Sequence, residues 1–183
     1  SCLPNLLKRG ENNGLKGLKI INKNEIKEIE PFVRGESAIL VPDTGIIDYV
    51  QVANKLGDLI QKINPNSKII TGQEVIDIKK ESNYSIILTK KSCFKSKYII
   101  ACAGLFSDRI AKLDNVKLNL KIVGFRGDYY TLTNDSKHKV KNLIYPVPNP
   151  EFPFLGVHFT RMTNGEIECG PNAVFTFKRE GYK

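Results

Sequence analysis

Apolar residues recur at helical spacing after Asp48, and this is the clearest pattern along the chain. The pattern predicts a helix over residues 48–63 that ends at an Asn-Pro-Asn turn, with an apolar stripe along one face that we expect to be buried. A shorter helix is predicted over residues 22–30, where an asparagine can cap the start and Pro31 ends the helix. A short apolar strand follows at residues 37–41.

The segment after the long helix is rich in β-strand patterns. Strands are predicted over residues 68–71, 74–81, 85–89 and 93–102, and the middle two are expected to form a hairpin. Residues 98–102 are continuously apolar, which is typical of a strand buried on both faces. This strand runs into Ala103-Gly104 and a helix that Ser107 is expected to cap. A strand, a glycine turn and a helix form half of a Rossmann corner, which presents backbone N–H groups to anionic ligands.

The last third of the chain has a different pattern. A long strand is predicted over residues 123–132, and its two glycines indicate bulges or a close backbone approach. Short strands separated by turns follow at 144–148, 154–160 and 166–169, which is typical of an antiparallel sheet. The chain as a whole is therefore predicted to combine an α/β part with antiparallel β-structure, an α+β fold.

Composition and charge narrow the range of functions. Of the 183 residues, 41% are hydrophobic and 26% are charged, the balance of a soluble globular protein. The net charge of +9 comes mainly from 22 lysines that are spread along the chain, whereas only six arginines are present. Nucleic-acid-binding proteins usually concentrate basic residues on one face and add arginines or stacking aromatic residues. We therefore expect a lysine-rich solvated surface and no nucleic-acid partner.

The four cysteines lie far apart and form no C-x-x-C pair, so we expect reduced thiols and no metal site. No apolar run reaches the roughly 18 residues that span a bilayer. The first residues lack the apolar stretch of a signal peptide, so we expect a cytoplasmic location.

Eight short motifs occur in an order that resembles one enzyme family. They are EIEPFVRG (28–35), PDTGIIDY (42–49), ACAGLFSDR (101–109), FRGDYY (125–130), IYPVP (144–148), PFLGVHFTRM (153–162), GPNAV (170–174) and FKREGY (177–182). Together they resemble the middle of an L-2-hydroxyglutarate oxidase or dehydrogenase. These enzymes are FAD-dependent oxidoreductases related to D-amino acid oxidase and glycine oxidase.

The resemblance implies a domain layout. Residues 48–119 would form part of a Rossmann-like FAD-binding domain, and residues 120–183 would form a truncated antiparallel sheet that binds the substrate. Residues 1–47 would be either a segment of that substrate domain or a connection to it. The G-x-G-x-x-G fingerprint that opens the family's FAD-binding domain does not occur in this sequence. The sequence therefore resembles an internal portion, and we expect these residues alone to bind FAD weakly and to turn over no substrate.

Three residues are candidates for cofactor binding. The resemblance places the backbone of Val75 near adenine, although an ordinary strand valine is an equally good interpretation. Ala103 and Gly104 end an apolar segment with bare backbone, which a ligand can approach closely. A plain tight turn is the alternative for these two residues.

The implied reaction removes a hydride from C2 of an L-2-hydroxy diacid and passes it to FAD, while a base takes the hydroxyl proton. His158 is the candidate base, because it alternates with apolar neighbours and an imidazole titrates near neutrality. Arg161 matches the position at which the family binds the substrate carboxylate, and Arg126 is a second candidate cation. Tyr145 and Thr44 are further candidate substrate contacts.

Several alternatives stay open at this point. A hydrogen-bonded core role suits His158, and core packing suits Tyr145. Lys178 and Arg179 are more consistent with surface charge than with binding of the second carboxylate. The chain could also belong to a related oxidoreductase of glycerol 3-phosphate or amino acids, or to a non-catalytic binding module. The electron acceptor, oxygen or a quinone, and peripheral association with a membrane are not fixed by the sequence.

Overall fold

The computed structural model describes residues 2–149, 151–152 and 154–181, so Pro153 and Tyr182 of the motifs lie outside the described residues. The chain divides into two compact units. The first unit consists of Ser1–Asn54 and Arg126–Val174, and the second of Lys55–Phe125 and Phe175–Lys183. Each unit therefore combines two segments that are far apart in the sequence. The division into residues 1–47, 48–119 and 120–183 stays a prediction.

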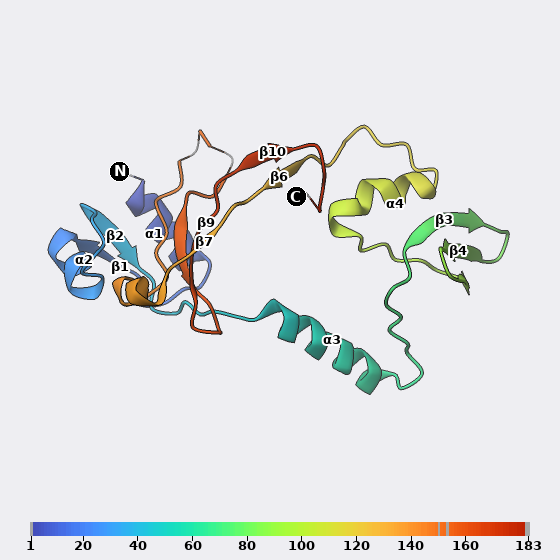
Figure 1. Cartoon of the computed structure of the whole chain (residues 1–183), viewed down its shortest axis with the longest axis horizontal. Coiled ribbons are helices and arrows are strands. Elements are labelled where there is room, and N and C mark those ends of the chain that lie inside the picture. Colours follow the sequence, from blue (N-terminus) through green and yellow to red (C-terminus); the bar gives the residue numbers. More distant parts are fainter. Residues whose placement is uncertain (1, 150, 153, 182–183) are drawn as a thin grey trace. The chain divides into compact units, whose positions relative to one another are not determined.

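The N-terminal part of the first unit packs two helices against a two-stranded antiparallel sheet (Figure 1). Its elements are α1 (Leu3–Asn12), β1 (Lys19–Asn22), α2 (Lys23–Ile29) and β2 (Ser37–Leu40). The pairing of β1 with β2 places Ile20 opposite Ile39. Ile21 and Ile26 are buried and form part of the core. The sequence predicted α2 and β2, whereas α1 and β1 were not predicted.

The start of α2 follows the predicted capping chemistry. The side chain of Asn22 accepts hydrogen bonds from the backbone N–H groups of Asn24 and Glu25, at 2.9 and 3.2 Å. In return, the backbone N–H of Asn22 donates to the Glu25 carboxylate at 2.8 Å, which completes a capping box. The predicted asparagine cap is confirmed.

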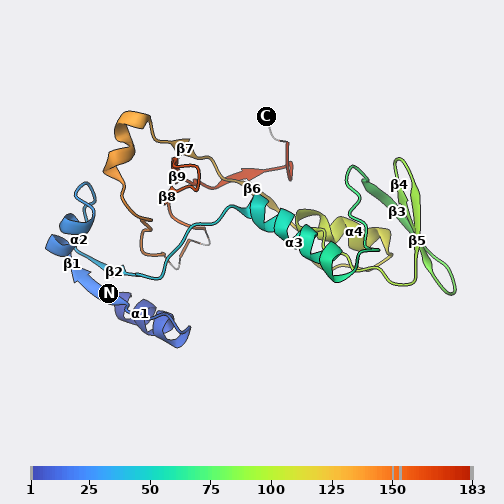
Figure 2. The same ribbon diagram turned by 90° about the horizontal axis from the view of Figure 1, so that it is seen from below.

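A three-stranded antiparallel sheet forms the other part of the first unit (Figure 2). In spatial order its strands are β7 (Tyr130–Thr131), β9 (Ile167–Gly170) and β8 (His158–Arg161), and the 3₁₀-helix Asn134–Lys139 follows β7 in the chain. The side chain of Ile167 is completely buried. The predicted strand at 144–148 is reduced to one bridge between Ile144 and Phe159. The predicted strand at 123–132 is interrupted between β6 (Gly124–Arg126) and β7.

The long helix α3 (Tyr49–Ile63) has the predicted length, but its apolar stripe is not buried. Asp48 caps the helix, because its side chain accepts from the backbone N–H groups of Val50 and Gln51. Ile63 is 84% exposed, and no residue of α3 is buried. The expectation of burial was wrong because no helix or strand among the described residues packs extensively on this face. Amphipathic spacing shows that a face suits burial, whereas burial itself requires a second surface.

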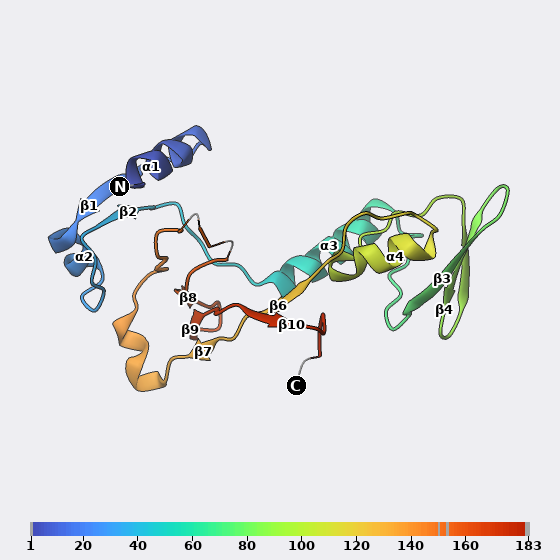
Figure 3. The same ribbon diagram turned by 90° about the horizontal axis from the view of Figure 1, so that it is seen from above.

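The second unit is built on an antiparallel meander of β3 (Val75–Lys80), β4 (Ser85–Thr89) and β5 (Cys93–Ser96), drawn in green in Figure 3. The predicted hairpin between β3 and β4 is confirmed, and its register places Ile78 opposite Ile87. Helix α4 (Ser107–Leu113) packs on β3, and Lys80 forms an ion pair with Asp114 at 3.0 Å just beyond the helix. Strand β10 (Val174–Thr176) pairs with β6.

Two predictions for the second unit were wrong. Residues 98–102 are not a strand, and Tyr98 and Ile100 are 86% and 88% exposed. A strand needs a neighbour for its backbone hydrogen bonds, and no strand among the described residues pairs with this segment. Residues 68–71 likewise form no strand. The described residues therefore combine helices with antiparallel sheets, and they contain no helix that is long and apolar enough to cross a bilayer.

Candidate functional site

A cavity of about 560 Å³ in the first unit brings three predicted substrate residues together. Thr44, Tyr145 and Arg161 all line it, although they come from three different segments of the chain. Most of the other lining side chains are apolar and come from α2, β2 and the segment around Ile144. An apolar cavity with a few convergent polar groups is the usual form of a small-molecule site.

Arg161 is the best-placed cation of this cavity. It lies at the end of β8 and is half-buried, and its Nη1 donates to the carbonyl oxygen of Val140 at 2.8 Å. Among the described residues, no carboxylate forms an ion pair with Arg161. One backbone bond uses only one of the five guanidinium N–H donors, so the other donors can bind a carboxylate.

Glu30 is a lining residue that the sequence analysis did not select. It is only 6% exposed, and its carboxylate accepts from the backbone N–H of Lys141 at 3.0 Å and from that of Asn142 at 2.5 Å. The side-chain amide of Asn142 also donates to it, at 2.8 Å. A buried carboxylate needs such donors, and here they connect the residue that follows α2 to residues 141–142. The sequence signal was weak: a glutamate four residues after the apolar Ile26, at the end of the predicted helix.

His158 lies next to the cavity wall and is not among the described residues that line it. Its ring stacks on Tyr145 with 4.7 Å between centroids, and it is 8% exposed. Nδ1 is 3.0 Å from the carbonyl oxygen of Gly156. Since a carbonyl can only accept, Nδ1 carries the proton, and the lone pair of the neutral ring is on Nε2. The histidine is thus held in the tautomer whose Nε2 can accept a proton.

Arg126 is engaged elsewhere in the first unit. Its Nε forms an ion pair with Asp128 at 2.7 Å, and its Nη2 donates to the same carboxylate at 3.0 Å. Arg126 is not among the described residues that line the cavity. The structure therefore does not bring Arg126 together with Arg161, and its role in substrate binding stays a prediction. Thr44 lines the cavity and donates from Oγ1 to the carbonyl of Val41 at 3.2 Å.

The three predicted cofactor residues all lie in the second unit. Val75 is the first residue of β3, whereas Ala103 and Gly104 begin the 3₁₀-helix Gly104–Phe106 that leads into α4, and α4 packs on β3. Gly104 has φ of +51°, a left-handed conformation that favours glycine, and a Cβ built on it would meet no heavy atom within 4 Å. The backbone at Gly104 is therefore exposed, and its contact with a cofactor stays a prediction.

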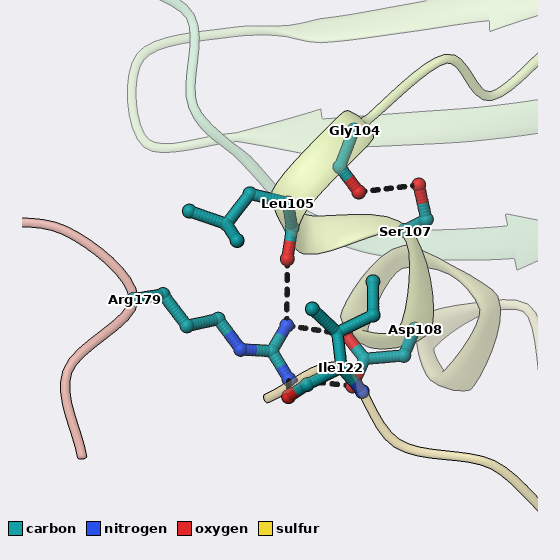
Figure 4. Close-up of polar contacts among 6 residues, drawn as sticks. All are labelled: Gly104, Leu105, Ser107, Asp108, Ile122 and Arg179. Atoms are coloured by element: carbon teal, nitrogen blue, oxygen red, sulfur yellow. Dashed lines mark hydrogen bonds and ion pairs between the residues drawn. The ribbon is translucent and has the colours of Figure 1, made fainter. Parts of the chain in front are cut away.

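The expected cap at Ser107 was wrong. Ser107 is the first residue of α4, and its hydroxyl donates to the carbonyl of Gly104 at 2.7 Å instead of accepting from the backbone of the helix (Figure 4). The hydroxyl thus closes the turn that contains the glycine. Seryl side chains often form such local bonds with the backbone, and they compete with helix capping.

A buried ion pair holds this corner of the second unit in place (Figure 4). The guanidinium of Arg179 binds both carboxylate oxygens of Asp108, and the side chains are only 11% and 4% exposed. Arg179 also donates to the carbonyls of Leu105 and Ile122, at 2.9 and 3.2 Å. The interpretation of Arg179 as surface charge was wrong, because its partner is 71 residues away and leaves no local signal in the sequence.

The ion pair shifts the pKa values of both its partners. Hydrogen bonds from Arg179 hold the pKa of Asp108 well below its usual range, although burial alone would raise this pKa. The same hydrogen bonds raise the pKa of Arg179. A carboxylate with a lowered pKa in the folded state stabilises that state at pH values above its unfolded pKa of about 3.9. The stabilisation is lost as the pH falls through the lower folded pKa.

We expect Asp108→Asn to lower the melting temperature of the whole protein by roughly 5 °C or more at pH 7, because Arg179 keeps its burial and loses its counter-charge. The difference from wild type should be constant above about pH 4 and should shrink below it. Thermal unfolding between pH 3 and 7 measures both effects. Asp114→Asn, which breaks the exposed pair with Lys80, is the matched control and should change little. Equal melting temperatures for Asp108→Asn and wild type would contradict a stabilising role.

Comparison with known proteins identifies the family. The family model described as FAD dependent oxidoreductase matches residues 3–182, so the chain belongs to this family. The resemblance inferred from the eight motifs is thereby confirmed.

Two relatives with similar sequences are both named L-2-hydroxyglutarate dehydrogenase. The chain is 49% identical over 182 residues to an L-2-hydroxyglutarate dehydrogenase of Indibacter alkaliphilus. The aligned residues cover 99% of this chain and 45% of that protein. It is 44% identical over 190 residues to the mitochondrial L-2-hydroxyglutarate dehydrogenase of Homo sapiens, covering 97% of this chain and 41% of that protein. The chain thus spans less than half the length of these relatives.

A solved structure supports the fold. Glycine oxidase from Geobacillus kaustophilus superposes with a TM-score of 0.58 at 17% sequence identity, covering 96% of this chain and 45% of that chain. At this level of identity the similarity concerns the fold alone.

Proposed function

We propose that the whole protein oxidises L-2-hydroxyglutarate to 2-oxoglutarate with FAD as the hydride acceptor. The observation that carries the proposal is the cavity that Thr44, Tyr145 and Arg161 line together. Relatives that are 43–49% identical over nearly the whole chain, and that are named L-2-hydroxyglutarate dehydrogenases, support it. The FAD-dependent family to which the chain belongs supports the choice of cofactor.

Residues of the second unit fit a contact with FAD. Gly104 has an open backbone, and Ala103 and Val75 belong to the same packed region of β3 and α4. We propose that these three residues belong to a partial Rossmann-like FAD-binding domain. When bound, FAD would accept the hydride from C2 of the substrate.

We propose that residues of the first unit bind the substrate and take the proton of its hydroxyl group. Arg161 would bind the carboxylate next to C2 through its remaining guanidinium donors. The Tyr145 hydroxyl and Thr44 would orient the substrate hydroxyl in the cavity. Nε2 of His158 would take the hydroxyl proton, since Nδ1 is occupied by its bond to Gly156. The apolar lining would exclude water.

The proposal is tested with the whole protein reconstituted with FAD. Under anaerobic conditions, L-2-hydroxyglutarate should bleach the flavin absorbance near 450 nm, an approximate wavelength for oxidised flavin cofactors. The D-enantiomer, glycerol 3-phosphate and L-amino acids serve as comparison substrates. Faster bleaching by glycerol 3-phosphate or by an amino acid would replace the proposed substrate, and no bleaching by any of them would favour a non-catalytic binding module. Reoxidation by oxygen or by a soluble quinone then identifies the electron acceptor. The cytoplasmic location also stays a proposal.

A further inference from the structure

The cavity in the first unit contains a second basic residue besides Arg161. Among the described lining residues, the groups that carry charge at neutral pH are Glu30, Lys141 and Arg161. The Glu30 carboxylate is occupied by the N–H groups of Lys141 and Asn142. Lys141 and Arg161 form no ion pair with any described residue. The described residues that line the cavity therefore include two cations without an ion pair, the exposed Lys141 and the half-buried Arg161, and one carboxylate whose acceptor sites are already in use.

The two cations are held by one short segment. Arg161 donates to the carbonyl of Val140, while the backbone N–H of the next residue, Lys141, donates to both carboxylate oxygens of Glu30, at 3.1 and 3.0 Å. Val140 itself is only 5% exposed, so the segment is anchored in the core between these bonds. Consecutive Cα atoms are about 3.8 Å apart. Glu30 therefore fixes the backbone of Lys141, and the preceding residue, Val140, accepts the hydrogen bond that orients the Arg161 guanidinium.

Other candidates for a second substrate cation are already paired. Arg126 is bound to Asp128 through two nitrogens, and Arg179 belongs to the ion pair of the second unit. A five-carbon diacid has a carboxylate at each end, and each carboxylate needs hydrogen-bond donors or a cation when it leaves water. Lysine suits the non-reacting end, because its flexible stem lets a compact charge follow a carboxylate without imposing a planar geometry.

We propose that Lys141 binds the distal carboxylate of the diacid and sets the preference for diacids over monoacids, with Glu30 as the residue that positions Lys141. The proposal rests on the proposed function and extends it to substrate selection. Arg161 holds the carboxylate next to the reacting carbon, and Lys141 distinguishes a substrate with a second carboxylate from one with an alkyl end.

The test compares two substrates on each variant of the whole protein. Lys141→Met removes the ammonium and keeps most of the stem. The ratio of kcat/KM for L-2-hydroxyglutarate to kcat/KM for L-2-hydroxyvalerate, the monoacid with the same five-carbon chain, should fall at least roughly tenfold. Lys141→Arg should restore part of the ratio. Because both substrates are measured on one preparation, partial misfolding changes both rates together and leaves the ratio intact.

Lys139→Met is the matched control, since Lys139 is an exposed lysine two residues away that is not among the described lining residues. Its ratio should equal that of wild type. If the monoacid is turned over too slowly, the dissociation constants of 2-oxoglutarate and 2-oxovalerate, measured through the flavin spectrum, give the same comparison. An unchanged ratio in Lys141→Met overturns the role of Lys141 while the proposed function stands. A wild-type protein that oxidises no 2-hydroxy acid overturns both proposals.

Discussion

Replacing Arg161 by alanine is expected to lower kcat/KM for L-2-hydroxyglutarate by roughly 10²–10³-fold, because the substrate carboxylate loses its charge-assisted partner inside an apolar cavity. The loss should appear mainly as a higher KM, since the carboxylate is bound in the ground state as well as in the transition state. Steady-state kinetics of the whole protein with FAD measures the effect.

Arg161 also donates to the carbonyl of Val140, so the variant needs a control for folding. Arg161→Lys keeps the charge and removes the planar fork, and it should recover part of the lost affinity. Arg34→Ala removes an exposed arginine of the same unit and should leave the kinetics unchanged. An Arg161→Ala protein with normal KM and kcat would remove this residue from the substrate site.

Replacing His158 by alanine is expected to reduce kcat by roughly 10²–10⁴-fold, the usual contribution of a general base. The bond from Nδ1 to Gly156 leaves Nε2 as the nitrogen that can accept the hydroxyl proton. Steady-state kinetics of the whole protein with FAD measures kcat.

The second histidine provides the comparison. His138 contacts Phe32 edge-on, with 5.5 Å between the ring centroids, in the same unit, and His138→Ala should leave kcat intact. His158 also stacks on Tyr145, so the alanine variant disturbs a lining residue of the cavity. A fall in kcat well below this range would show that His158 only supports Tyr145.

Local chemistry made part of the fold predictable. The cap at Asn22 and the β3–β4 hairpin depend on residues that are close in sequence, and the structure contains both. Residues 98–102 and the apolar stripe of α3 were misjudged because burial depends on distant surfaces. An apolar pattern shows what a segment can bury, and it does not show whether a partner is present.

The candidate site, like the fold, could be predicted only in part from the sequence. The motif resemblance selected Thr44, Tyr145 and Arg161, and the structure places all three around one cavity. Glu30 was missed because its partners lie 111 and 112 residues further along the chain. A glutamate before a proline looks like an ordinary helix end. Only the folded backbone shows that it receives N–H groups from a remote segment.

The interleaved construction of the two units has a consequence for synthesis on the ribosome. Because each unit combines an early segment with a late one, neither can be completed until its second segment has left the exit tunnel. In the second unit, Asp108 stays without its ion-pair partner until Arg179, 71 residues later in the chain, has been made. During that interval an unpaired carboxylate and apolar strand edges are exposed to solvent or to a chaperone, and contacts between such distant residues form slowly. Nascent chains arrested before residue 175 should therefore be cleaved readily by protease within residues 104–122, whereas chains that extend past residue 181 by the length of the tunnel should resist it.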